Sequence, residues 1–410
     1  MFADSNYKDT AAANRGEFLE KTIAKLASRV FGVDRVFSNV IIRSTNNQIV
    51  AEADVMITYG EFILVIQAKS KRLTIQARSG DPAKIQSDFS SSIQAAYDQA
   101  VKFIDLVLDG AECECGRNNK RSFAEVFRAF PLVVLSDHFP ALTYLGNHLI
   151  KRKSGRDPLI LGLFFLEVML SVLNHPVDAL YYLQQRARFF ERVMASSEFD
   201  LLGYHLAQKL YVPDDVHFMS TEHSFGSDLD DYFSAMEAGR TPSVSFRRLE
   251  ERVEVPMIAS LISALKAGPP ELAGTAIEVL DFSGGALQRM ADTIVMVREE
   301  VKAGKRFRAF SIETHYGGIT YVAVSTLSNE MTAAAEAIGR KHKYNAKKDR
   351  WYVVLDHINS ASPVDGIISL RRVWTESGET EEFLRYVDTL TRSTRVSFRA
   401  AAPVEKPASD

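Results

Sequence analysis

The chain is poor in cysteine, with only Cys113 and Cys115 among its 410 residues. Two cysteines separated by a single residue rarely close a comfortable disulfide, and two ligands do not complete a tetrahedral zinc site. We therefore expect two ordinary residues on a turn or a short hairpin, in a reducing cytoplasm.

Long apolar runs are also missing. The strongest one, residues 158–173, contains Glu167 and is shorter than the roughly 20 residues that span a bilayer. Residues 1–15 are polar and contain no apolar signal core. These absences predict a soluble, cytoplasmic protein with no membrane partner.

The sequence has no large excess of charge of either sign. Its 49 Lys and Arg residues face 52 Asp and Glu residues, which gives a formal net charge of -3. This balance argues against a protein that coats nucleic acid over its whole surface, so any nucleic acid would have to bind at a local basic patch. At roughly 100–200 residues per domain, the length predicts two or three domains.

The first 178 residues begin with the pattern of a helix followed by three strands. Residues 16–30 place their apolar side chains on one helical stripe. Three β-rich runs follow at residues 36–43, 49–58 and 62–68, with turn-forming residues between them. The third run, FILVIQA, is apolar on both faces, which is typical of the middle of a sheet.

The rest of this first domain predicts further helix and strand. Apolar residues at helical spacing indicate a helix over residues 83–108, and strands are expected at 130–135 and at 159–165. The resulting order, αβββαβ with one further strand, is that of an α/β domain with a mixed sheet and helices packed on its faces.

Two further regions and a tail follow. Residues 179–305 are expected to be mainly helical, and residues 306–399 to form a small α+β module. Residues 400–410 are rich in Pro and Ala and are expected to be a flexible tail. The expected helices and strands of these regions are helices at 177–193, 257–267, 271–280, 285–303 and 329–340, and strands at 307–314, 318–324 and 350–355.

A group of polar residues stands at the hairpin of the second and third strands. Asp54 lies inside an apolar run, where a carboxylate is costly unless it is paired or binds a cation. Gln67 and Lys69 end the most apolar strand and, being two residues apart, point to the same face. Across a turn at residues 59–61, Asp54 and Gln67 fall nearly opposite one another. The sequence thus predicts one patch with a carboxylate, an amide oxygen and an ammonium group.

Hydrolysis of a phosphodiester needs such a set of groups. Oxygen ligands hold Mg²⁺, and the metal lowers the pKa of a bound water, while a nearby cation stabilises the developing charge. Glu17 and Glu20 lie on one side of the first helix, and either could add a carboxylate. The structural alternative is that Asp54 caps a turn, Gln67 is a satisfied core amide and Lys69 extends from a strand end towards water.

These residues, in this order of elements, resemble the PD-(D/E)xK nuclease superfamily. Within it the chain is most similar to the nuclease-related (NERD) and Mrr-type restriction endonuclease-like domains. Residues 16–20, GEFLE, resemble the GExxE start of such domains, Asp54 matches the metal-binding aspartate, and residues 67–69, QAK, match the QxK form of the motif. The resemblance covers about 165 residues and departs from the family in having a neutral residue at position 67.

The resemblance implies a restriction-endonuclease-like fold and a set of roles. Asp54, Gln67 and the Ala68 carbonyl would bind Mg²⁺ or Mn²⁺, Lys69 would position or activate the attacking water, and Glu20 would be an accessory metal or water ligand. Glu17 is the weaker choice for that accessory role. On the second helix, Gln94 is similar to a glutamine of the family.

Several cations are candidates for contact with a nucleic-acid backbone. Three of them, Lys71, Arg72 and Arg78, follow the strand that ends in Lys69. Others lie in a basic run at residues 340–350, next to two aromatic residues that could stack bases. The candidates in this run are Lys341, Lys343, Lys347 and Lys348. The alternative interpretation of this run is a solvated helix end, where cations are favoured by the helix dipole.

We therefore expect a metal-dependent endonuclease that acts on DNA, with RNA as the open alternative. The resemblance implies a setting in restriction or defence. A homodimer or a protein partner bound through the C-terminal region is a further expectation. The rival hypothesis is a nuclease fold with a weakened metal site that binds nucleic acid or regulates a partner without cleavage.

Overall fold

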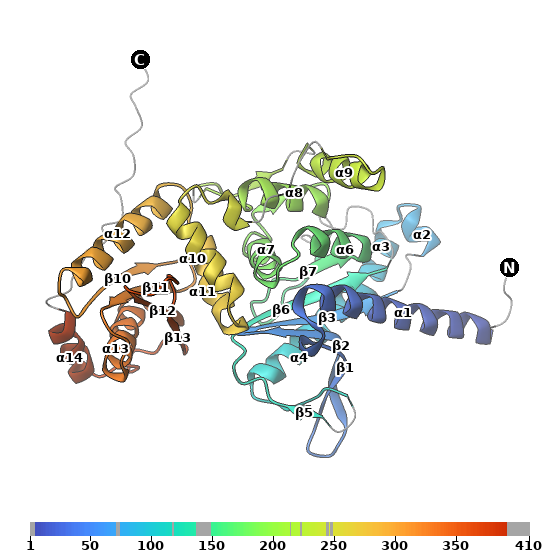
Figure 1. The fold of residues 1–410 in the computed structure, drawn as a ribbon. Helices are drawn as coiled ribbons and strands as arrows, with labels where there is room; N and C mark the ends of the chain where they lie inside the picture. The colour runs from blue at the N-terminus through green and yellow to red at the C-terminus, as the bar shows by residue number, and fades with distance from the viewer. Residues whose placement is uncertain are drawn as a thin grey trace. The chain divides into compact units, whose positions relative to one another are not determined.

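The fold was determined as a computed structural model. The structure describes residues 5–70, 74–116, 119–136, 149–213, 215–221, 224–242, 246 and 249–391. The chain divides into two compact units, Met1–Leu249 and Glu250–Asp410 (Figure 1). The helical region expected at residues 179–305 is therefore shared between the two units.

The first unit is built on a seven-stranded mixed sheet with the strand order β5-β4-β1-β2-β3-β6-β7. Strands β1, β2 and β3 pair in antiparallel fashion, whereas β3, β6 and β7 run parallel. The strands are β1 (Val36–Arg43), β2 (Ile49–Tyr59), β3 (Phe62–Lys69), β4 (Cys113–Glu114), β5 (Lys120–Arg121), β6 (Arg128–Leu135) and β7 (Leu159–Gly162). The expected mixed sheet of an α/β domain is confirmed.

Strand β3 lies in the interior of this sheet, as its sequence predicts. Its residues from Phe62 to Gln67 are buried, because β2 and β6 flank it and helices cover both faces. The turn that joins it to β2 contains Gly60 at a φ of 57°, a left-handed conformation that glycine adopts without steric cost. The seventh strand is shorter than expected and ends at Gly162, where the chain turns directly into helix.

Helices α1 (Ser5–Phe31) and α4 (Ala95–Leu108) cover opposite faces of the sheet. Alternate residues of β3 point to opposite faces, and Leu64 packs on the α1 side while Val65 packs on the α4 side. Helix α1 begins earlier than expected, at Ser5.

The expected helix at residues 83–108 is interrupted in its middle. It consists of α3 (Pro82–Phe89), a π-helical turn (Ser90–Gln94) and α4. A short helix, α2 (Ile75–Arg78), precedes it. The remaining helices of this unit are α6 (Leu163–Val172), α7 (Pro176–Arg188), α8 (Glu198–Gln208) and α9 (Ser224–Glu237). Of these, α7 is buried along most of its length, polar residues such as Asp178 and Arg186 included.

The second unit contains a four-stranded sheet in the order β10-β11-β12-β13. Strands β11 and β12 are parallel and the two outer pairs are antiparallel, so helix α13 (Asn329–Asn345) forms the crossover between the parallel strands. The strands are β10 (Phe307–Glu313), β11 (Gly318–Val324), β12 (Arg350–His357) and β13 (Gly366–Arg371). The other α-helices are α10 (Pro256–Ala267), α11 (Ala273–Leu280), α12 (Gly285–Lys302) and α14 (Glu381–Thr391). The expected α+β module is present, while β13 and α14 were not anticipated.

Both cysteines are free, and Cys113 is buried in β4. Among the helices in the described ranges, none combines the length and the apolar character needed to cross a membrane.

Candidate active site

The candidate site forms where β2 and β3 separate. Their ladder runs from the pair Tyr59 and Phe62 to the pair Val55 and Ile66. One residue further, Asp54 Oδ2 accepts a hydrogen bond of 2.7 Å from the backbone N–H of Ala68. A carboxylate thus takes the place of a backbone carbonyl as the partner of this N–H, and the ladder opens beyond it.

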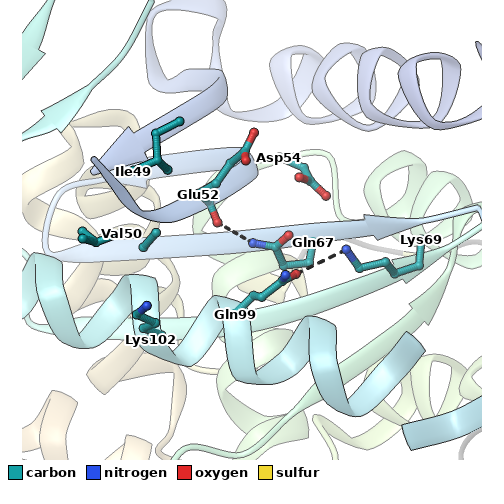
Figure 2. A pocket seen from close by; sticks show the side chains of 9 residues that line it. Ile49, Val50, Glu52, Asp54, Gln67, Lys69, Gln99 and Lys102 are labelled. Atoms are coloured by element: carbon teal, nitrogen blue, oxygen red, sulfur yellow. Dashed lines mark hydrogen bonds between the residues drawn. The ribbon is translucent and has the colours of Figure 1, made fainter. Parts of the chain in front are cut away.

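A pocket of about 350 Å³ occupies this opening. Asp54 lines it from β2, and Gln67 and Lys69 line it from β3 (Figure 2). The three residues that the sequence grouped together therefore do lie together. The complete lining consists of Ile49, Val50, Ala51, Glu52, Asp54, Gln67, Lys69, Gln99 and Lys102.

Gln67 is oriented by a hydrogen bond to the backbone of β2. Its side chain is only 2% exposed, and its Nε2 donates to the carbonyl oxygen of Glu52 at 2.7 Å. Because the amide nitrogen is used in this bond, the amide oxygen is the end that remains for the pocket (Figure 2). Gln67 is thus a satisfied core amide and a pocket-lining oxygen donor at the same time.

The backbone carbonyl of Ala68 lies on the same side of β3 as Asp54. The N–H and C=O of one strand residue point to the same neighbouring strand, and the N–H of Ala68 points to Asp54. The next carbonyl, that of Lys69, accepts from the N–H of Ser136 on the other side. Asp54, Gln67 and Ala68 therefore direct three oxygen donors to the gap between β2 and β3.

Burial governs the electrostatics of the two candidate carboxylates. Desolvation raises the pKa of Asp54, and the hydrogen bond from Ala68 and the charge of Lys69 partly offset this rise. Desolvation also raises the pKa of Glu20, with a further contribution from the negative charges of Asp54 and Glu52. Glu20 is thus electrostatically coupled to the site, although it does not line the pocket.

Glu17 behaves differently from Glu20. It is exposed and forms an ion pair of 2.6 Å with Lys21 one helical turn away, and this hydrogen-bonded pair lowers the pKa of Glu17. Of the two glutamates that the sequence offered, Glu20 is therefore the one that faces the site.

The donor set suits a cation that needs few protein ligands. In the described part of the chain, no three or more His, Cys, Asp or Glu side chains come together to hold a metal ion. The oxygens at the gap are one carboxylate, one amide and one backbone carbonyl, with Glu20 nearby. Mg²⁺ keeps several waters and commonly binds through one or two carboxylates plus substrate phosphates, so this sparse set fits it.

Three polar residues of the pocket were missed in the sequence. Glu52 precedes Asp54 by two residues on β2, and Gln99 and Lys102 come from α4. Gln99 Oε1 accepts a hydrogen bond from Lys69 Nζ at 3.4 Å. The sequence pattern that could have identified Gln99 and Lys102 is their i, i+3 spacing, which puts both on the same polar side of an otherwise apolar helix.

Gln94 has a structural role in this fold. Its side chain accepts a hydrogen bond from the backbone N–H of Lys151 at 2.8 Å and donates to the carbonyl of the same residue at 3.0 Å. It also donates to Asp98 at 2.8 Å. Gln94 thus holds the segment that precedes β7 and does not line the pocket.

Comparison with family models, with curated proteins and with solved structures found no match to the chain.

The expected basic contacts near the site are only partly visible. Lys71 and Arg72 lie outside the described residues. Arg78 is the last residue of α2, and only its backbone belongs to the described part of the chain.

The basic run at residues 340–350 is not a loop beside exposed aromatics. Helix α13 continues to Asn345, so most of the run is the end of a helix. Trp351 and Tyr352 are 2% and 0% exposed, because both side chains belong to the buried central strand β12. They are not available to stack on bases, and this part of the prediction is corrected.

The four lysines of this run have partners within the second unit. Two of them form ion pairs, one donates to a backbone carbonyl and one lies over an aromatic ring. These contacts are Lys341 with Asp388, Lys348 with Glu313, Lys343 with the carbonyl of Arg372, and Lys347 with the ring of Trp374. Burial lowers the pKa of Lys343 as well. The interpretation as a helix end describes this run better than a nucleic-acid surface does.

The raised pKa of Asp54 predicts a pH-dependent effect on stability. Asp54→Asn should raise the free energy of unfolding of the metal-free protein at neutral pH, because an ionised buried carboxylate is removed. Below the ordinary pKa of 3.8 the wild-type carboxyl is protonated in both states, so this gain should disappear. Between that value and the raised pKa the gain should shrink as the pH falls.

Urea unfolding in EDTA at a series of pH values measures this difference. Asp109→Asn, at the exposed position directly after α4, is the matched control and should show no such trend. A stability gain that grows in acid would contradict the prediction.

The hydrogen bond of Gln67 predicts that Gln67→Glu destabilises the fold. An ionised glutamate has no donor for the Glu52 carbonyl and would set two buried oxygens against each other, which costs about 1–3 kcal/mol. The loss should fade in acid, where a protonated carboxyl can donate. Urea unfolding at pH 8 and pH 5 tests this, with Gln67→Met as the uncharged control. Equal stabilities of Gln67→Glu and wild type at pH 8 would refute it.

Proposed function

We propose that the first unit is a Mg²⁺-dependent nuclease with a restriction-endonuclease-like core of the PD-(D/E)xK type, acting on DNA. The observation that carries this proposal is that Asp54, Gln67 and Lys69 line one pocket at the point where β2 and β3 separate. An accidental pairing of these residue types on a buried hairpin would not require a pocket that all three line.

The oxygen donors at the gap would hold the metal ion. Asp54 supplies the charge, while Gln67 and the Ala68 carbonyl supply neutral oxygens, and Mn²⁺ could replace Mg²⁺ in such a set. When bound, the ion polarises the phosphate and lowers the pKa of a coordinated water. Glu20, which is electrostatically coupled to Asp54 and Lys69, would accept a hydrogen bond from a water at the edge of this set.

Lys69 would orient the attacking water and stabilise negative charge on the phosphate. Its ammonium group is held by Gln99 on α4 and reduces the raised pKa values of both Asp54 and Glu20. The pocket therefore presents a cation and a carboxylate to the same small volume, as phosphoryl chemistry requires. A setting in restriction or defence remains an expectation of the resemblance.

One observation favours a second candidate function, a nuclease fold that binds nucleic acid without cleavage. The described residues contain no group of three acidic or metal-binding side chains, and position 67 is neutral. Metal affinity would then depend on Asp54 with Glu20 nearby.

Incubation of the full chain with plasmid DNA, single-stranded DNA and RNA separates the two functions. We expect products with Mg²⁺ or Mn²⁺ and none with EDTA. Binding of the same substrates without products at any metal concentration would favour the second function. If the chain neither binds nor cleaves any of these nucleic acids, both candidate functions are overturned.

A further inference from the structure

The pocket extends well beyond the group formed by Asp54, Gln67 and Lys69. Lys102 of α4 lines it together with Ile49 and Val50 at the start of β2, and Figure 2 shows these three residues at the opposite end from Lys69. Lys102 lies three residues after Gln99, about 4.5 Å further along the helix axis. The proposed reacting centre thus fills only one end of the pocket.

Lys102 differs from Lys69, the other cation that lines the pocket, whose ammonium group donates a hydrogen bond to Gln99. The side chain of Lys102 is exposed and, within the described ranges, forms neither an ion pair nor a hydrogen bond. By contrast, two other cations of the first unit are paired with carboxylates of α4. Lys153 forms an ion pair with Asp98, and Arg156 forms one with Asp105. The ammonium of Lys102 therefore faces the pocket with its charge not neutralised by a partner in the described chain.

Apolar residues line the same end of the pocket as Lys102. Ile49 is 54% exposed although it is a strand residue, and it lines the pocket. An ammonium group next to an exposed aliphatic surface matches a nucleotide, which has an anionic phosphate joined to a largely apolar sugar and base face. A pocket of about 350 Å³ is at the small end of the range of ligand sites, so it would take one such unit of a strand.

We propose that Lys102 binds the phosphate next to the one that is cleaved, so that the substrate is a polynucleotide strand and not a single phosphate ester. This inference rests on the proposed function. Lys102 acts as a point charge on a flexible stem, which tolerates any base sequence. Ile49 would pack against the sugar or base that links the two phosphates.

Lys102→Gln tests this contact while keeping the helix, since Gln is a good helix former. With a single-stranded oligonucleotide we expect KM to rise about tenfold with kcat nearly unchanged. The slope of the logarithm of binding affinity against the logarithm of salt concentration should fall in magnitude by about one, as expected for the loss of one phosphate contact. Lys84→Gln, which removes the same charge from an exposed position of α3 outside the pocket, is the matched control.

A second experiment modifies the substrate instead of the protein, and it locates the phosphate that Lys102 contacts. Neutral methylphosphonate linkages placed on both sides of one cleavable phosphodiester should raise KM for wild type but have little further effect on Lys102→Gln. Such non-additivity is the signature of two changes that remove the same interaction.

The outcomes separate this inference from the proposed function. If wild type neither binds nor cleaves oligonucleotides, the proposed function fails and this inference with it. If wild type cleaves and Lys102→Gln leaves KM and the salt dependence unchanged, the proposed function stands and the inference is overturned. A fall in kcat alone, or additive effects of the variant and the methylphosphonates, would also overturn it.

Discussion

Asp54→Asn is expected to abolish detectable nucleic-acid cleavage. The asparagine can still accept the hydrogen bond from Ala68, so the strand geometry is kept while the negative charge of Asp54 at the gap is lost. Charge stabilisation by a metal is worth several kcal/mol, and about 4 kcal/mol corresponds to a rate loss of about 10³-fold. Single-turnover cleavage with Mg²⁺ and with Mn²⁺ measures this loss.

The same variant should also lose its response to the metal. Mg²⁺ should raise the Tm of wild type by binding the native state, and it should not raise that of Asp54→Asn. Asp109→Asn serves as the control, because it removes an exposed carboxylate that does not line the pocket. If Asp54→Asn cleaves as fast as wild type, catalysis at this pocket is excluded.

Glu61→Ala is expected to give a large loss of stability in the first unit. Glu61 and Arg128 form an ion pair of 2.8 Å with side chains that are 1% and 5% exposed. Removal of one partner leaves a buried guanidinium without its counter-charge, and this typically costs about 3–5 kcal/mol. Urea unfolding of the full chain measures the change.

The position of this ion pair connects it to the site. The carbonyl of Glu61 accepts from the N–H groups of Phe127 and Arg128, so the residue holds the starts of β3 and β6 together. The candidate site lies at the other end of β3. We therefore expect Glu61→Ala to weaken activity through loss of folded protein, with the kcat of the remaining folded fraction less affected.

Two companion variants make this prediction specific. Glu17→Gln breaks an exposed ion pair and should leave the free energy of unfolding essentially unchanged. Glu61→Leu combined with Arg128→Met removes both charges and should recover most of the loss, because well-packed apolar residues often replace a buried pair. A loss below about 1 kcal/mol for Glu61→Ala would contradict the argument from burial.

Much of the first unit could be predicted because its local signals agree with one another. Strands β1, β2 and β3 follow from β-rich runs separated by turn residues, and the continuous apolar sequence of β3 places it inside the sheet. The register of a hairpin depends on its turn, so the turn at Gly60 alone brings Asp54 near the end of β3. In the second unit, β13 and α14 were missed, although α14 is amphipathic and β13 contains an apolar run.

The sequence by itself determined the mixed sheet of the first unit and the grouping of Asp54, Gln67 and Lys69, because both depend on local alternation and a short hairpin. The tertiary structure decided what surrounds that group. Gln99 and Lys102 reach the pocket only because of how α4 is rotated on the sheet, and Glu20 rather than Glu17 faces it because of how α1 packs.

The same distinction explains the basic run in the second unit. Its composition suggested a surface for nucleic acid, but ion-pair partners such as Asp388 and Glu313 lie dozens of residues away in the chain. No local pattern records such pairings, since they arise when α13 packs against distant elements. The charges themselves are set by composition, but only tertiary packing determined that Lys341 and Lys348 are neutralised within the chain while Lys102 is not paired in the described part.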